Sequence, residues 1–130
     1  IISLHMPLLE STRHFVNAET IARMKDGVTI INCARGELMN IPDMIRGIET
    51  QKIGALALDV FDKEDGIYHE NRRDDILSNR DMAYLRQFPN VIMTQHMAFY
   101  TDAAVQSMVF CGIEGLCDFA RTGHTATELV

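Results

Sequence analysis

The 130-residue chain lacks a surplus of positive charge. Twelve lysines and arginines stand against eighteen aspartates and glutamates, which gives a formal net charge of -6. Non-specific nucleic-acid binding needs a basic face to meet phosphate, so the composition argues against a nucleic-acid partner. An anionic small molecule would need a local basic group instead.

The chain also lacks a cysteine framework and a continuous apolar segment. Its three cysteines form no C-x-x-C pair and leave an odd count, which is typical of reduced thiols in a cytosolic protein: Cys33, Cys111 and Cys117. We expect them to be small core residues. No apolar run approaches the roughly 20 residues of a spanning helix, and no basic n-region precedes an apolar one. These absences predict a cytoplasmic protein without a membrane partner.

An initiating methionine is absent as well. The sequence opens directly in Ile1-Ile2-Ser3-Leu4-His5, which reads as a core strand already under way. We therefore expect the chain to be part of something longer.

Apolar runs alternate with stretches of helical spacing. The runs predict four strands, at about residues 1–5, 28–34, 53–60 and 90–95. Helices are expected after the capping residues Asn17, Asn40 and Thr101, with a short one at about 80–87. Gly27 and Gly123 are the expected left-handed stops. The alternation predicts an α/β fold with a parallel sheet, and the near-continuous apolar run at 53–60 predicts a strand covered on both faces.

Polar side chains follow each predicted strand. His5, Arg35, Asp59 and His96 stand at or just past four different strand ends, and Glu64 follows a few residues after one of them. In an open parallel sheet these ends share one edge, where ligands bind. We therefore expect the five side chains to converge.

Each of these residues also has a structural interpretation. His5 fits a hydrogen-bonded structural histidine, Asp59 a helix or turn cap, and Glu64 a solvated acidic turn. His96, which follows an apolar strand and precedes Met97-Ala98-Phe99, is harder to dismiss as structural. Arg35 is the first functional candidate, because an arginine closing a core strand is costly without an anionic partner.

The residue types favour carbonyl reduction or proton transfer over acyl transfer. A histidine beside a carboxylate can exchange protons, and a nearby arginine can hold a substrate carboxylate. Cys33 is a poor candidate nucleophile, because it adjoins a strand interior. His69 and Glu70 with His96 do not make a convincing ligand set, so no metal is expected.

Four motifs, in order, carry a family resemblance. They are Ser3-Leu4-His5-Met6-Pro7-Leu8 with Thr12 and Asn17, Asn32-Cys33-Ala34-Arg35-Gly36, Ala57-Leu58-Asp59-Val60-Phe61 with Glu64, and Asn90-Val91-Ile92-Met93-Thr94 with His96. The chain resembles the carboxyl-terminal half of the D-isomer-specific 2-hydroxyacid dehydrogenases. The stretch from His96 to Thr101 is most similar to the D-lactate and D-2-hydroxyisocaproate dehydrogenase branch.

The resemblance implies a catalytic set. Arg35 would bind the carboxylate and carbonyl oxygen of a 2-oxo acid, and His96 would deliver the proton while NADH delivers hydride. Glu64 would pair with His96, and Phe99 and Tyr100 would line the substrate pocket.

The resemblance also implies NAD as the cofactor. Asp59 would contact the nicotinamide amide. The other implied cofactor-binding residues are His5, Met6, Pro7, Thr12, Cys33, Ala34, Arg35 and His96.

The sequence departs from the family pattern at Asn40, Asp65 and Gln95, and no G-x-G-x-x-G is present. We therefore expect a partial Rossmann-like sheet with flanking helices, the second half of a dinucleotide-binding domain. Residues 1–100 would be its nicotinamide half. Residues 101–130 would be a long carboxyl-terminal helix and tail returning toward the substrate domain.

The leading prediction is an NAD-dependent oxidoreductase interconverting a 2-oxo acid and a D-2-hydroxy acid. The active form would be a longer parent, expected to be a homodimer, and this chain alone would bind NAD weakly. Two alternatives stay open. One is a regulatory NAD(H)-binding protein of the corepressor type, and the other is an inert fragment.

Overall fold

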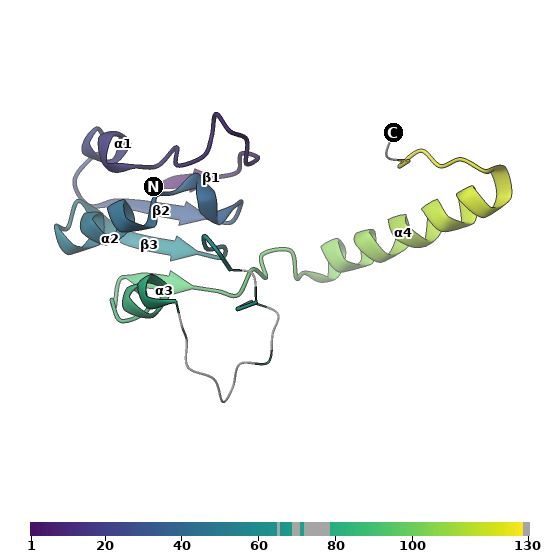
Figure 1. The fold of residues 1–130 in the computed structure, drawn as a ribbon. Helices are drawn as coiled ribbons and strands as arrows, with labels where there is room; N and C mark the ends of the chain where they lie inside the picture. Colours follow the sequence, from purple (N-terminus) through teal and green to yellow (C-terminus); the bar gives the residue numbers. More distant parts are fainter. Residues whose placement is uncertain (65, 69–70, 72–78, 129–130) are drawn as a thin grey trace. The chain divides into compact units, whose positions relative to one another are not determined.

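The structure is a computed structural model that describes residues 1–64, 66–68, 71 and 79–128. These residues form two compact units, Ile1–Met97 and Ala98–Val130. The first holds a sheet with its helices, and the second holds one long helix (Figure 1).

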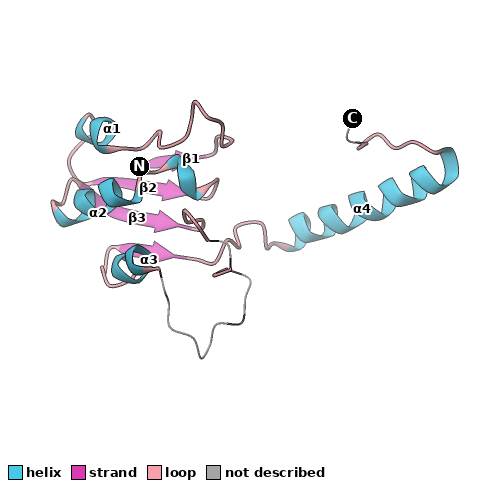
Figure 2. Cartoon of the chain, viewed as in Figure 1, coloured by secondary structure: helices cyan, strands magenta, loops and turns pink. Residues whose placement is uncertain are grey.

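The sheet of the first unit is parallel throughout, as predicted. Its strands are β1 (Ile2–Leu4), β2 (Val28–Asn32), β3 (Ile53–Leu58) and β4 (Val91–Met93). They lie in the order β1-β2-β3-β4, and a helix occurs between each strand and the next (Figure 2). This is the βαβ arrangement that alternating apolar and helical segments predict.

The strand register defines one edge of the sheet. Leu4 pairs with Asn32, Asn32 with Leu58, and Leu58 with Met93, so these four residues form a row across the sheet. The residues that follow this row in sequence therefore emerge side by side at the carboxyl edge.

Asparagine caps begin the helices of the first unit. Asn17 accepts from the backbone N–H of Glu19 and Thr20 at the start of α1 (Ala18–Ala22), and Asn40 accepts from that of Asp43 at α2 (Ile41–Glu49). Both caps were predicted, and each satisfies amide groups that a helix start leaves without a partner. Helix α3 (Arg80–Leu85) begins at Asn79 in the same way.

Two expectations about these elements are wrong in detail. Helix α1 ends at Ala22, and Gly27, with φ of 72°, lies in the turn into β2 rather than at the helix end. Burial alternates along β3, with Leu56 and Leu58 buried and Ala55 and Ala57 only partly so. Helix α2 packs on β3 (Figure 1), so one face of this strand is buried more fully than the other.

The second unit consists of α4 (Asp102–Thr122) and the residues around it. Thr101 caps its start and Gly123, with φ of 77°, ends it, as predicted. None of the residues of α4 is buried, and the helix is long and apolar enough to cross a membrane by length and composition alone. Its acidic residues Asp102, Glu114 and Asp118 interrupt the apolar positions, which recur as the stripe of an amphipathic helix.

The cysteines are not core residues. Cys33, Cys111 and Cys117 are all exposed, because Cys33 follows β2 at the sheet edge and the other two lie on α4. Most of the charged stretch from 67 to 81, with His69 and Glu70, lies outside the described residues.

Candidate active site

A histidine and a carboxylate meet beyond the carboxyl edge of the sheet. The Nδ1 atom of His96 lies 2.5 Å from Oε1 of Glu64, and the two side chains are 31% and 22% exposed. An ionised carboxylate only accepts hydrogen bonds, so Nδ1 carries the proton of this bond. The pair predicted from two distant motifs is therefore formed.

The loop after β3 holds Glu64 in place. Its second oxygen, Oε2, accepts the Phe61 backbone N–H at 2.8 Å, and Phe61 is 3% exposed. The Glu64 carbonyl accepts from the N–H groups of Ile67 and Tyr68. Burial raises the pKa of the Tyr68 phenol, and the Glu64 carboxylate raises it further, so the tyrosine stays neutral beside the carboxylate.

Asp59 organises the segment that carries the histidine. Its carboxylate Oδ1 accepts the Thr94 hydroxyl at 2.5 Å and the Met97 backbone N–H at 2.9 Å, and its carbonyl accepts the His96 N–H at 2.6 Å. Asp59 is only 4% exposed. It thus bonds to residues on both sides of His96 and to His96 itself.

The backbone of His96 is left-handed, with φ of 54°. Few residues other than glycine adopt this region, although histidine, asparagine and aspartate do so more often than most. The conformation is costly and persists only where neighbours enforce it, which the Asp59 bonds do here.

Arg35 lies in the turn directly after β2. Its Nη1 donates to the carbonyl of Ala34 at 2.7 Å, and the side chain is exposed. The turn lies against the Glu64 loop, because the Cα of Gly36 faces the peptide that joins Phe61 to Asp62. The arginine and the His96–Glu64 pair thus stand on adjacent segments of one edge.

The other predicted cofactor residues lie along the same edge. His5 directly follows Leu4, the last residue of β1, and its Nε2 forms a hydrogen bond with the Ser3 hydroxyl at 2.7 Å. Met6 and Pro7 continue this segment, and the Thr12 hydroxyl donates to the Pro7 carbonyl at 2.9 Å.

Cys33 and Ala34 directly follow Asn32, the last residue of β2. Desolvation raises the pKa of the Cys33 thiol, and the Asp59 carboxylate raises it further. The thiol is therefore neutral at pH 7, unlike an activated nucleophile.

Phe99 and Tyr100 belong to the second unit. Their rings meet edge to face, with centroids 6.2 Å apart, and both are exposed. Their predicted place in a substrate pocket stays a prediction. Across the part of the chain that the structure describes, no cluster of three or more histidine, cysteine or acidic side chains could hold a metal ion.

Three residues that contribute to this geometry were part of the quoted motifs but were given no role from the sequence. Asn32 and Thr94 bond at the strand ends, and Gly36 lies at the contact between the two loops. A polar residue that closes an apolar strand was the available signal for the first two. Nothing local marked Gly36, because its contact is with a segment 25 residues away.

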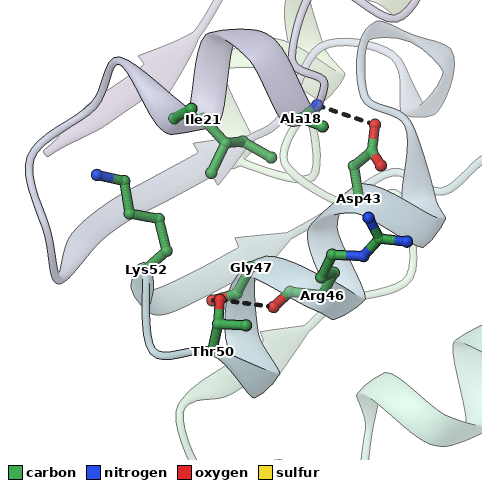
Figure 3. Close-up of a pocket in the computed structure, with 8 residues that line it drawn as sticks. Ala18, Ile21, Asp43, Arg46, Gly47, Thr50 and Lys52 are labelled. Carbon is green, nitrogen blue, oxygen red and sulfur yellow. Dashed lines mark hydrogen bonds between the residues drawn. The ribbon is translucent and has the colours of Figure 1, made fainter.

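A cavity of about 350 Å³ lies elsewhere, between α1 and α2 (Figure 3). Its wall includes Ile21 of α1 and Arg46 and Gly47 of α2, together with Lys52, which precedes β3. The Asp43 carboxylate joins the two helices by accepting the Ala18 N–H at 2.9 Å. None of the predicted site residues lines this cavity.

The fold and the edge together define a class of protein. Parallel α/β sheets bind nucleotide cofactors outside the carboxyl ends of their strands, and here that edge gathers a carboxylate-bound histidine and an arginine. The first unit is therefore a dehydrogenase-type, Rossmann-like domain. The chain belongs to the D-isomer specific 2-hydroxyacid dehydrogenases, since the model of that family's NAD-binding domain matches residues 1–98.

Relatives support the same assignment. The aromatic 2-oxoacid reductase of Clostridium sporogenes is 43% identical over 130 residues, which is 100% of this chain and 39% of that protein. A putative D-lactate dehydrogenase of Dictyostelium discoideum is 37% identical over the same span, 38% of its length. The chain thus spans about two fifths of the length of these relatives.

Solved structures confirm the predicted fold. A D-lactate dehydrogenase from Sporolactobacillus sp. superposes with a TM-score of 0.94 at 30% identity, covering 98% of this chain and 39% of the other. A D-lactate dehydrogenase from Treponema pallidum gives 0.92 at 33% identity, covering 99% and 39%. The family resemblance, the partial Rossmann-like architecture and NAD as the family's cofactor are therefore confirmed.

Proposed function

We propose that this chain supplies the proton donor and the substrate-binding arginine of an NAD-dependent oxidoreductase that interconverts 2-oxo acids and D-2-hydroxy acids. The observation that supports this proposal most directly is the 2.5 Å contact between His96 Nδ1 and Glu64 Oε1 at the carboxyl edge of a parallel sheet.

The contact supports a choice of the proton-transferring atom. Because Nδ1 donates to Glu64, Nε2 is the ring nitrogen that gives its proton to the developing alkoxide during reduction and takes it back during oxidation. The Glu64 carboxylate fixes the ring and stabilises its positive charge. The Phe61 N–H keeps the carboxylate oriented by holding its second oxygen.

Arg35 recognises the substrate in this proposal. A guanidinium offers a planar fork that matches a carboxylate in two parallel hydrogen bonds. Its position directly after β2, beside the Glu64 loop, suits it to orient the carbonyl toward His96.

The residues at the edge fit the nicotinamide end of the cofactor. The small side chains of Cys33 and Ala34 leave room for a planar ring, and His5, Met6, Pro7 and Thr12 border the neighbouring strand end. NAD, when bound, supplies or accepts the hydride. The Asp59 carboxylate is already bonded to Thr94 and Met97, so we expect it mainly to keep His96 in place beside the ring.

Phe99 and Tyr100 are the proposed contacts of the substrate side chain. Two exposed aromatic rings suit an apolar or aromatic group. The printed names of the relatives, aromatic 2-oxoacid reductase and D-lactate dehydrogenase, make phenylpyruvate and pyruvate the substrates to compare. We further propose that the active protein is a homodimer in the cytoplasm.

A hybrid enzyme tests the proposal. This chain would replace the 130 residues of the Clostridium sporogenes reductase that align with it at 43% identity. We expect the hybrid to oxidise NADH when given phenylpyruvate or pyruvate, and to form the D-hydroxy acid. An Arg35→Ala hybrid is expected to bind NADH and to lose turnover.

The outcomes separate the competing interpretations. A folded hybrid that binds NADH but turns over no 2-oxo acid would contradict the enzymatic proposal and favour a regulatory nucleotide-binding role. Formation of the L-hydroxy acid would contradict the proposed stereochemistry.

A further inference from the structure

The turn that carries Arg35 is built by one buried side chain. Asn32 is 0% exposed, and its Oδ1 accepts the Ala34 N–H at 3.0 Å while its Nδ2 donates to the Arg35 carbonyl at 2.8 Å. A single amide thus fixes the backbone on both sides of the Ala34–Arg35 peptide, in the manner of an Asx-turn.

The same residue ties this turn to the neighbouring strand. The carbonyl of Asn32 accepts the Asp59 N–H at 3.0 Å. Asp59 in turn holds Thr94, His96 and Met97. The arginine turn and the histidine segment therefore share one continuous set of hydrogen bonds.

Gly36 sets the distance between the turn that carries Arg35 and the loop that carries Glu64. It is buried, and a Cβ at this position would clash with the backbone atoms of Phe61 and Asp62. The obstruction is backbone rather than the end of a flexible side chain, so a methyl group can be accommodated only by moving one loop. One of these loops starts at Phe61, whose N–H holds Glu64, and the other carries Arg35, so either movement changes the separation of the two sites.

From these contacts we infer that Asn32 and Gly36 are positioning residues, which fix the arginine turn and the His96–Glu64 pair at the separation that the reaction needs. The inference rests on the proposed function for its chemical meaning, while its geometric content can be measured without any turnover. Asn32 sets the orientation of the turn, and Gly36 sets how closely the turn approaches the Glu64 loop.

A pair of glycine substitutions tests this inference. In Gly36→Ala the new methyl meets backbone, whereas in the matched control Gly47→Ala, on α2, it meets the flexible side chain of Ile53. Both glycines are buried, and Gly47 lies away from the carboxyl edge. Both variants add the same group to the interior of the same unit.

The first readout uses the 130-residue chain by itself. Nitrogen-15 NMR of the His96 ring reports the Nδ1–H bond to Glu64. We expect Gly36→Ala to shift the Nδ1 resonance and to speed exchange of its proton, and Gly47→Ala to leave both as in the parent sequence. Unchanged His96 signals in Gly36→Ala would overturn the inference.

The second readout uses the hybrid enzyme. A misplacement of about 1 Å can lower the rate about 100-fold, so we expect kcat/KM to fall by roughly that factor in Gly36→Ala and by no more than about 2-fold in Gly47→Ala. Equal losses in the two variants would mean a general packing effect and would overturn the inference. An inactive hybrid whose His96 signals nevertheless respond to Gly36→Ala would contradict the proposed function while leaving the geometric coupling intact.

Asn32→Asp provides a second variant if Gly36→Ala does not fold. It keeps the acceptor for the Ala34 N–H and loses the donor to the Arg35 carbonyl. We expect a higher KM for the 2-oxo acid, about 10-fold, with NADH affinity changed less than 2-fold, because a turn that releases Arg35 weakens carboxylate binding first. An unchanged KM in a folded Asn32→Asp protein would contradict the role given to the amide.

Discussion

Replacing Glu64 by glutamine removes the negative charge that faces His96 and leaves one acceptor oxygen where the carboxylate has two. That oxygen can serve the 2.5 Å contact with Nδ1 or the Phe61 N–H, but not both. Hydrogen bonds to charged groups contribute about 1.5–3 kcal/mol, and the 31% and 22% exposure of the two side chains places this one at the lower end. About 1.4 kcal/mol corresponds to a tenfold change in rate, so kcat/KM of the hybrid enzyme should fall about 10-fold.

A double-mutant cycle makes the test specific. His96→Asn removes the proton donor and should lower kcat/KM by about 10²–10⁴-fold. If Glu64 acts through His96, then Glu64→Gln should cost almost nothing further in the His96→Asn background. The assay is NADH oxidation at 340 nm with phenylpyruvate, and NADH binding by fluorescence is the control for folding. A full 10-fold loss from Glu64→Gln in the absence of the histidine would refute the reasoning, because the carboxylate would then act on its own.

Three further predictions concern the arginine, a thiol and the core. Arg35→Lys keeps the positive charge but loses the planar guanidinium fork, so KM for the 2-oxo acid should rise about 10–100-fold with NADH affinity unchanged. An unchanged KM would mean that the substrate carboxylate binds elsewhere. Cys33 should react with iodoacetamide more slowly than a free cysteine peptide at pH 7.5, because desolvation, and to a smaller extent Asp59, raises the pKa of its thiol. Mass spectrometry across pH 7–10 measures the alkylation rate. Alkylation as fast as that of the peptide would contradict the prediction. Leu56→Ala, at a side chain that is 1% exposed, should lower the free energy of unfolding by about 2–5 kcal/mol in urea titration. The control Ile92→Ala, at a side chain that is 66% exposed, should change it by less than about 0.5 kcal/mol. Similar losses at both positions would contradict the assignment of the buried face.

The order of elements could be predicted from local sequence signals, and the pairing of His96 with Glu64 from the family resemblance. Apolar runs gave the four strands, and asparagine and threonine caps gave the helix starts, because both signals are local. Convergence of the polar residues followed from topology alone, since parallel strands present their carboxyl ends at one edge. The pair lies there as expected, although its members are 32 residues apart.

The sequence did not reveal how Asp59 and Gly36 act, because their contacts are between distant segments. The carboxylate of Asp59 bonds to Thr94 and Met97, more than thirty residues away, and Gly36 faces the Phe61 backbone. The exposure of the cysteines was missed for a related reason. Cysteine is usually buried, but Cys33 comes one residue after the last strand position, where the chain leaves the core.

The left-handed backbone at His96 restricts how this position can evolve. At φ of 54°, β-branched and bulky residues are disfavoured, and glycine, asparagine, aspartate and histidine adopt this region most readily, although Gln51 and Lys63 also do so in this chain. Of these, histidine alone has an ordinary pKa near neutrality. A residue at this position therefore has to accept the left-handed backbone and also transfer a proton near neutral pH, and histidine meets both requirements.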